Sequence, residues 1–182
     1  MNIYAGIGSR QTPAYVIDDM VHIGKLAAGG WILRSGAAQG ADAAFEKGCD
    51  LQHGEKEIYL PWYNFNDHPS LLTSPSDEAL QLASNIHPAY KSLPDPVKRL
   101  LARNMHQILG KDLNTPVRCV ICWTPNGQLN KKQYTRQSGG TGSAIALASD
   151  WDIPVFNLFY PKHFNEAIEY ILDPDKEDIM QL

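Results

Sequence analysis

Short apolar runs alternate with longer segments of helical periodicity along this chain. Five runs have the length and apolar character of buried strands, at 2–5, 31–34, 57–60, 117–123 and 154–158. Between and after them, apolar residues recur three or four positions apart, most clearly in 13–28, 96–109 and 164–171. Strands that alternate with helices in this way predict an α/β fold, a Rossmann-like open parallel sheet of about five strands flanked by helices.

Capping and helix-breaking residues mark the ends of several of these helices. Thr12 followed by Pro13 is typical of an N-cap and a first helical residue, and Gly29–Gly30 ends the same helix. Ser74–Asp77 has the composition of another helix start, and His87–Pro88 of the end of that helix.

The composition fits one compact domain with a full core, since 43% of the 182 residues are hydrophobic and 20% are charged. No repeat or linker interrupts the pattern, so we expect residues 1–182 to form a single domain with an acidic, frayed tail from about Asp173. No segment approaches the roughly 20 apolar residues of a membrane span, and the first residues lack a signal-peptide pattern. We therefore expect a cytoplasmic protein without a membrane partner.

The net charge and the cysteine positions argue against some classes of function. A formal net charge of −4 argues against a dedicated nucleic-acid binder, although a local basic patch is compatible with it. Cys119 and Cys122 have a spacing that also occurs in redox and metal sites. They lie inside the apolar run 117–123 without a second Cys or His pair, so we interpret them as buried structural residues. We expect neither a metal nor another cofactor.

A glycine-rich segment before the last strand has the features of an anion site. Residues 138–148 pass from glycine into a small, apolar, helix-forming stretch, and the first turn of a helix offers unpaired N–H groups and a positive dipole end. Thr141 and Ser143 would add hydroxyl donors, and cationic side chains are available from Lys131, Lys132 and Arg136. The predicted phosphate site consists of Gly139, Gly140, Thr141, Gly142 and Ser143. Alternatively, the glycines only permit a tight turn from strand to helix.

Two further loops of small residues follow the first two strands. In a parallel sheet both lie at the carboxyl ends of the strands, where ligands bind near the topological switch point. The first loop begins like a dinucleotide fingerprint with Gly6 and Gly8, but Gln11 stands where the third glycine is needed, which argues against an NAD site. The second loop, residues 35–42, enters a helix at Asp42. This carboxylate either complements the helix dipole or contacts a ribose hydroxyl or a catalytic proton.

Other candidate contacts come from elsewhere in the chain. Arg103 and Asn104 lie in the middle of a mostly apolar helix, where the arginine either extends to water or binds a phosphate. The aromatic residues of 62–65 either stack on a base or cover the sheet edge. The polar loop 124–138 has the composition of a mobile lid.

Taken together, four motifs in order resemble the Rossmann-like domain of the DNA-processing protein A family (DprA, also called Smf), within the SLOG superfamily. The motifs are Gly8–Arg10, Arg34–Asp42, Arg103–Asn104 and Ser138–Thr141. The resemblance covers most of the chain and implies a stand-alone version, of the kind seen in bacteria and their phages. In that family the matching residues face a positively charged pocket for the phosphates of single-stranded DNA; here they are Ser9, Arg10, Ser35, Gly36, Arg103 and Asn104. The resemblance also implies a homo-oligomer, because proteins of this fold often self-associate.

Two other branches of the superfamily imply other functions. The Lonely Guy (LOG) phosphoribohydrolases cleave nucleoside monophosphates at the N-glycosidic bond, with a Pro-Gly-Gly-x-Gly-Thr motif that precedes catalytic glutamates. This chain is similar in the phosphate-binding part, but Ile145 and Ala146 occupy the places of the glutamates. Asp42 and Glu46 are the candidates left to replace them. A third branch senses nucleotide-derived signals such as cyclic ADP-ribose-like molecules.

The leading hypothesis is a non-catalytic binder of a nucleotide or a nucleotide-derived phosphorylated molecule, such as an ADP-ribose derivative, at the carboxyl ends of the strands. The backbone of 139–143 would hold one phosphate, and Ser9 and Arg10 a second anionic group. Ser35–Gly40 would contact the ribose, and Arg103 would neutralise charge. The alternatives are LOG-like hydrolysis of a nucleotide N-glycosidic bond and DprA-like binding of single-stranded DNA.

Overall fold

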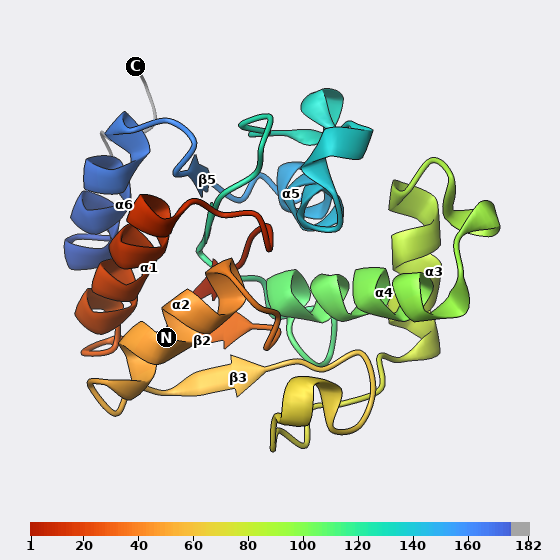
Figure 1. The fold of residues 1–182 in the computed structure, drawn as a ribbon, viewed down its shortest axis with the longest axis horizontal. Coiled ribbons are helices and arrows are strands. Elements are labelled where there is room, and N and C mark those ends of the chain that lie inside the picture. Colours follow the sequence, from red (N-terminus) through yellow and green to blue (C-terminus); the bar gives the residue numbers. More distant parts are fainter. Residues whose placement is uncertain (176–182) are drawn as a thin grey trace.

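In the computed structural model, which describes residues 1–175, five strands form one parallel sheet (Figure 1). The strands are β1 (Asn2–Gly6), β2 (Trp31–Ser35), β3 (Lys56–Ile58), β4 (Cys119–Cys122) and β5 (Val155–Asn157), in the order β3-β2-β1-β4-β5. β1 is the central strand, because Tyr4 pairs in register with Leu33 on one side and with Cys119 on the other. The predicted Rossmann-like open parallel sheet is confirmed.

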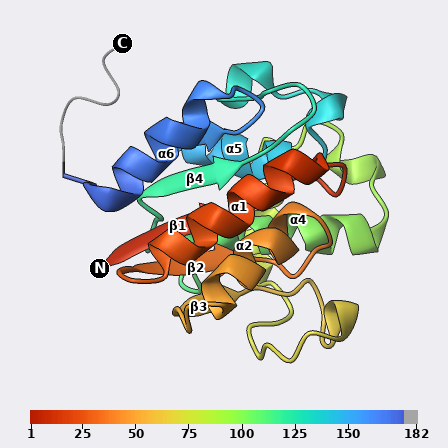
Figure 2. The ribbon, with the colours of Figure 1, turned by 60° about the vertical axis from the view of Figure 1, so that its left-hand side comes forward.

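Six α-helices flank the sheet in the described part of the chain (Figures 1 and 2). They are α1 (Ala14–Ala27), α2 (Ala41–Asp50), α3 (Asp77–Ile86), α4 (Asp95–Leu109), α5 (Thr141–Asp150) and α6 (Lys162–Leu172). The loops also contain single turns of 3-10 helix at η1 (Phe65–Asp67), η2 (Tyr90–Ser92), η3 (Lys131–Gln133) and η4 (Arg136–Ser138).

Side chains of β1 alternate between the two faces of the sheet, and this alternation divides the core in two. Tyr4 packs with side chains of α1, α2 and α6, whereas Ile3 and Ala5 pack with side chains of α3, α4 and α5. Figure 2 shows α1, α2 and α6 on one face of the sheet and α4 and α5 on the other. A sheet covered on both faces explains why its strands are short apolar runs without polar alternation.

The strand order creates a topological switch point next to β1. The chain proceeds from β1 outward through β2 to β3, then crosses back and continues through β4 to β5 on the other side. The loop after β1 leads to α1 on one face, and the loop after β4 leads to α5 on the opposite face. Two loops that diverge in this way open a crevice at the carboxyl ends of the strands.

The observed helix starts agree with one sequence prediction and correct another. α3 begins at Asp77, within the predicted helix start 74–77, and the Ser76 Oγ caps it by accepting a hydrogen bond from the Ala79 N–H at 3.2 Å. Thr12, in contrast, does not cap α1. Pro13 occupies the N-cap position, and the Thr12 hydroxyl donates to the Ser9 carbonyl at 2.6 Å. The Thr12 side chain therefore secures the loop after β1 and leaves the helix end uncapped.

The third strand is shorter than the predicted run 57–60. β3 ends at Ile58, and Leu60 forms only an isolated bridge with Thr73. The Leu60 N–H donates to the Leu72 carbonyl at 2.8 Å, so the chain leaves the sheet to pair with the following loop.

Cys119 and Cys122 are fully buried free thiols in β4, and burial raises the pKa of both.

Within residues 1–175, none of the helices has the length and apolar character that a membrane span requires. The same residues contain no group of three His, Cys, Asp or Glu side chains that could hold a metal ion. Most of the predicted acidic tail, from residue 176 on, lies outside the described residues, and Asp175 before it pairs with Arg118 at 2.9 Å.

Candidate functional site

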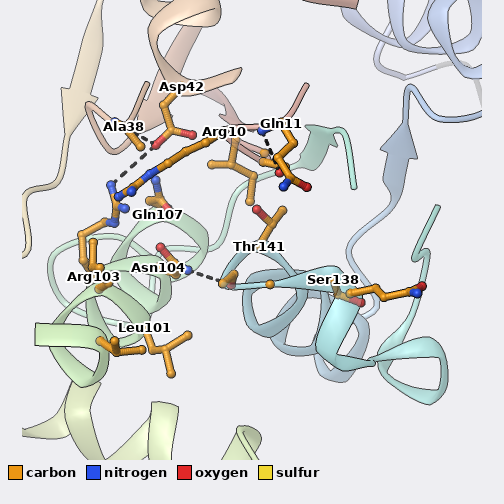
Figure 3. Close-up of a pocket in the computed structure, with 18 of the residues that line it drawn as sticks. Arg10, Gln11, Ala38, Asp42, Leu101, Arg103, Asn104, Gln107, Ser138 and Thr141 are labelled. Atoms are coloured by element: carbon orange, nitrogen blue, oxygen red, sulfur yellow. Dashed lines mark hydrogen bonds and ion pairs between the residues drawn. The ribbon is translucent and has the colours of Figure 1, made fainter. Parts of the chain in front are cut away.

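A cavity of about 590 Å³ lies at the switch point, at the carboxyl ends of β1, β2 and β4 (Figure 3). Its walls come from the loops that follow β1 and β2, from α4, and from residues 136–141 at the start of α5. Its charged lining residues in the described part of the chain are Arg10, Asp42, Arg103 and Arg136.

Arg103 comes from the buried face of α4 and is only 5% exposed. Its Nη1 donates to the Gly36 carbonyl and, at 3.4 Å, to the Tyr59 carbonyl, so the guanidinium joins the loops after β2 and β3. A Cβ atom at Gly36 would overlap this Nη1, and glycine at this position therefore makes room for the arginine. Burial lowers the pKa of Arg103, whereas the nearby Asp42 raises it.

Asp42 faces Arg103 from the first turn of α2 and is 3% exposed. Its Oδ2 lies 3.6 Å from Arg103 Nη1 and accepts a long hydrogen bond of 3.4 Å from the Ala38 N–H. Burial raises the pKa of Asp42 to about 6, because the loss of hydration outweighs the attraction of Arg103 and the backbone hydrogen bonds from Ala38 and Gly8. A carboxyl group that titrates near neutral pH therefore lies in the cavity wall.

Arg10 is exposed in the loop after β1, and its side chain runs across the cavity toward Asp42 and Arg103 (Figure 3). The positive charge of Arg10 lowers the pKa of Arg103. The loop that carries Arg10 packs tightly on the loop after β2. Gly40 adopts a positive φ of 87°, and a Cβ atom there would lie 2.9 Å from the Ser9 carbonyl oxygen. Glycine at position 40 thus allows the two loops to pack closely, because a side chain there would collide with the loop after β1.

The start of α5 forms the opposite wall of the cavity, with Gly139, Gly140 and Thr141. Asn104 Nδ2 donates to the Gly140 carbonyl at 2.9 Å and so fixes this turn to α4. A Cβ atom at Gly139 would meet nothing within 4 Å, so this part of the backbone is open to a ligand. The Gly139 N–H already donates to the Arg136 carbonyl at 3.3 Å, whereas the N–H groups of Gly140 and Thr141 have no backbone acceptor within residues 1–175. Free N–H groups in the first turn of a helix suit an anion.

The predicted phosphate loop 139–143 reaches the cavity only in its first part. The N–H groups of Gly142 and Ser143 already donate to the carbonyls of Gly139 and Gly140, at 3.3 and 3.2 Å. The Ser143 hydroxyl donates to the Gly140 carbonyl at 2.8 Å and is fully buried. Gly142 and Ser143 therefore stabilise the turn and do not line the cavity.

Four other predicted residues also lie outside the cavity lining: Ser35, Gly36, Gly40 and Glu46. The Ser35 hydroxyl is buried and donates to the Gly6 carbonyl at 2.7 Å, which links β2 to β1. Glu46 forms an ion pair of 2.8 Å with Lys56, and its carboxylate also lies 2.8 Å from His68 Nε2. Of the two acidic candidates for catalysis, only Asp42 lines the cavity.

The cationic and aromatic candidates are divided between the cavity and other contacts. Arg136 lines the cavity, whereas Lys131 pairs with Asp150 at the far end of α5. Trp62 and Phe65 pack edge to face, with ring centroids 5.1 Å apart, beside the buried Arg103. Ile145 and Ala146, at the positions of the LOG glutamates, are buried in α5.

The loop 124–138, expected to be a mobile lid, is anchored at its start. The Asn157 side chain donates to the Thr124 hydroxyl at 2.8 Å and to the Gln128 carbonyl at 2.9 Å. Thr124 and Gln128 are fully buried, so both ends of the segment 124–128 are fixed in the protein interior. Among the loop residues, Arg136, Gln137 and Ser138 line the cavity.

Gln107 is a buried polar cavity residue that the sequence analysis missed. It lies one helical turn after Arg103 on α4, is 2% exposed and lines the cavity. Its Nε2 has no hydrogen-bond partner among residues 1–175. The spacing of four residues from Arg103 was the available signal, because positions i and i+4 share one face of a helix.

The fold and the cavity define an α/β protein with a Rossmann-like parallel sheet and an arginine-lined cavity at its switch point. Comparisons with protein-family models, with curated proteins and with solved structures each found no match.

Proposed function

We propose that this protein binds a nucleotide, or a phosphorylated molecule derived from one, in the cavity at the carboxyl ends of β1, β2 and β4, without catalysing its conversion. A cavity of about 590 Å³ lies within the size range of small-molecule sites. One phosphate would lie against the backbone of Gly139, Gly140 and Thr141, where helix N–H groups and the positive end of the α5 dipole favour an anion.

The charge of the cavity lining is the observation that carries this proposal. Arg10, Arg103 and Arg136 line the cavity, and in the described chain Asp42 is the one carboxylate that does so. This local excess of positive charge contrasts with the net charge of −4 of the whole chain. An electropositive cavity in an acidic protein selects an anionic ligand small enough to enter it.

Isothermal titration with adenosine 5′-monophosphate tests the proposal. Arg136→Ala removes a charged donor from the α5 end of the cavity and should raise the Kd at least tenfold, since such hydrogen bonds contribute about 1.5–3 kcal/mol. Arg99→Ala is the matched control, because Arg99 is also an exposed arginine and does not line the cavity. Equal Kd values for the wild type and Arg136→Ala would refute this site.

Single-stranded DNA is the ligand that the family resemblance implies, and a short oligodeoxynucleotide belongs in the same titration. Binding to DNA phosphates would weaken steeply with added salt, because neutralised phosphates release counterions. Tight, salt-dependent binding of the oligonucleotide with no binding of the mononucleotide would replace the small-molecule proposal.

Hydrolysis of a nucleotide N-glycosidic bond is the second candidate, and the position of Asp42 favours it. The Asp42 carboxyl group lines the cavity, and its pKa of about 6 is suited to proton transfer near neutral pH. Incubation with a panel of nucleoside monophosphates, followed by chromatography for free base, tests this function. Release of base that Asp42→Asn abolishes would establish hydrolysis, and intact nucleotides would exclude it for that panel.

A further inference from the structure

Nitrogen donors gather at the end of the cavity formed by α4 and the loop after β1, and we call Arg10, Arg103 and Gln107 the donor cluster. Figure 3 shows the Arg10 side chain directed toward those of Arg103 and Gln107. Arg103 and Gln107 are more than nine-tenths buried, and in the part of the chain that the structure describes neither Arg103 Nε nor Gln107 Nε2 has a hydrogen-bond partner.

Asp42 does not satisfy these donors. Its Oδ2 is 3.6 Å from Arg103 Nη1, which is beyond hydrogen-bond distance, and this oxygen already accepts from the Ala38 N–H. Arg10 and Arg103 carry like charges: burial lowers the pKa of Arg103, and the positive charge of Arg10 lowers it further. Buried donors without acceptors and two neighbouring positive charges are both stabilised by a bound anion.

The structure assigns the donor cluster as a second anion subsite, so that the ligand is a nucleotide with two phosphoryl groups on separate positions. This inference rests on the proposed function, which places the first phosphoryl group at Gly139, Gly140 and Thr141. The second phosphoryl group would accept hydrogen bonds from Arg10, Arg103 and Gln107.

The chemistry of the donor cluster favours a phosphoryl group over a base carbonyl. A phosphoryl group offers three acceptor oxygens and up to two negative charges, which match two guanidinium groups and an amide. A neutral base carbonyl would accept one or two hydrogen bonds and would bring no negative charge to Arg10 and Arg103.

The position of Asn104 indicates that the two phosphoryl groups are separated. In Figure 3, Asn104 lies between the donor cluster and Thr141, and its amide is already bonded to the Gly140 carbonyl. The α5 end of the cavity has its own arginine, Arg136, so each end can neutralise a separate phosphoryl group. A nucleoside 3′,5′-bisphosphate carries its charges in this way, and a 5′-diphosphate does not.

Isothermal titration with three adenosine nucleotides tests the second subsite: the 5′-monophosphate, the 5′-diphosphate and the 3′,5′-bisphosphate. The last two carry the same number of phosphoryl groups and differ in where they are attached. We expect the wild type to bind the 3′,5′-bisphosphate at least about tenfold more tightly than the 5′-diphosphate, the gain typical of one further charged hydrogen bond.

Substitution of Gln107 connects this preference to the donor cluster. Gln107→Glu replaces a donor by a carboxylate and should abolish the preference for the 3′,5′-bisphosphate. Gln107→Met removes the amide at similar volume and should have the same effect, and thermal unfolding verifies that both variants are folded. Gln81→Glu makes the same change in charge on the exposed surface of α3 and should retain the preference.

Each failure has its own meaning. If the wild type binds the 5′-diphosphate at least as tightly as the 3′,5′-bisphosphate, or if both Gln107 variants keep the preference, the second subsite is wrong and the proposed function stands. If none of the three nucleotides binds, the proposed function fails, and the second subsite fails with it.

Discussion

The buried carboxyl group of Asp42 makes the stability of this protein depend on pH in an unusual direction. Most carboxylates gain favourable partners on folding, and their pKa falls. Burial instead raises the pKa of Asp42 to about 6, from about 3.9 in an unfolded chain. Asp42→Asn removes the titrating group and keeps a polar side chain of nearly the same shape.

The sign and size of the effect follow from these two pKa values. Between pH 4 and pH 6 the folded protein retains a proton on Asp42 that the unfolded chain has released, so the free energy of unfolding falls as the pH rises. The contribution is complete below the unfolded pKa and is lost as the pH passes through the folded pKa. Each pH unit between them is worth about 1.4 kcal/mol, which amounts to about 3 kcal/mol in total and about 2 kcal/mol between pH 4 and pH 7.

Urea denaturation of the wild type and of Asp42→Asn at several pH values between 4 and 7 measures this term, because all other titrating groups contribute equally to both proteins. The wild type should gain about 2 kcal/mol relative to the variant as the pH falls from 7 to 4. Asn104→Ala is the control, since it alters the same cavity and keeps the carboxyl group, and it should follow the wild-type profile. A difference between wild type and Asp42→Asn that stays constant over this range would show that Asp42 is not desolvated as described.

Three further substitutions or treatments have defined outcomes. Gly36→Ala places a methyl group against the Arg103 guanidinium and should lower the free energy of unfolding by about 2 kcal/mol in urea denaturation; an unchanged midpoint would contradict the contact. Asn157→Ala removes a fully buried amide that anchors the loop after β4 and should lower the free energy of unfolding by about 2–4 kcal/mol; a loss below about 1 kcal/mol would show that the loop is held by other contacts. Cys119 and Cys122 should not react with a thiol reagent in the folded protein and should react in urea, as mass spectrometry can determine; rapid labelling without denaturant would contradict their burial in β4.

Local sequence signals predicted the fold because each acts over a few neighbouring residues. The run that became β4 is apolar throughout, and the structure buries it on both faces of the sheet. The start of α3 could be predicted from the sequence, because the residue that caps this helix, Ser76, directly precedes it in the chain. The end of β3 could not be predicted from the sequence. The Leu60 N–H donates to the Leu72 carbonyl instead of continuing the strand, and this hydrogen bond depends on where the following loop lies.

The same distinction applies to the candidate site. Arg10, Arg103 and the glycines before α5 could be identified as anion-binding candidates from residue type and loop position. The roles of Gly36 and Ser35 could not, because a glycine that admits an arginine and a hydroxyl that joins two strands resemble ligand contacts in sequence.

The sequence by itself determined the alternation of strands and helices, the apolar faces and the small-residue loops, since periodicity and turn chemistry are local properties. Only the tertiary structure decided which of the candidate side chains meet. The strand order β3-β2-β1-β4-β5 brings the loops after β1 and β4 beside α4, so that Gln107 enters the cavity, whereas Glu46 pairs with Lys56 outside it. These encounters follow from packing between elements that are far apart in the chain, and no local pattern encodes them.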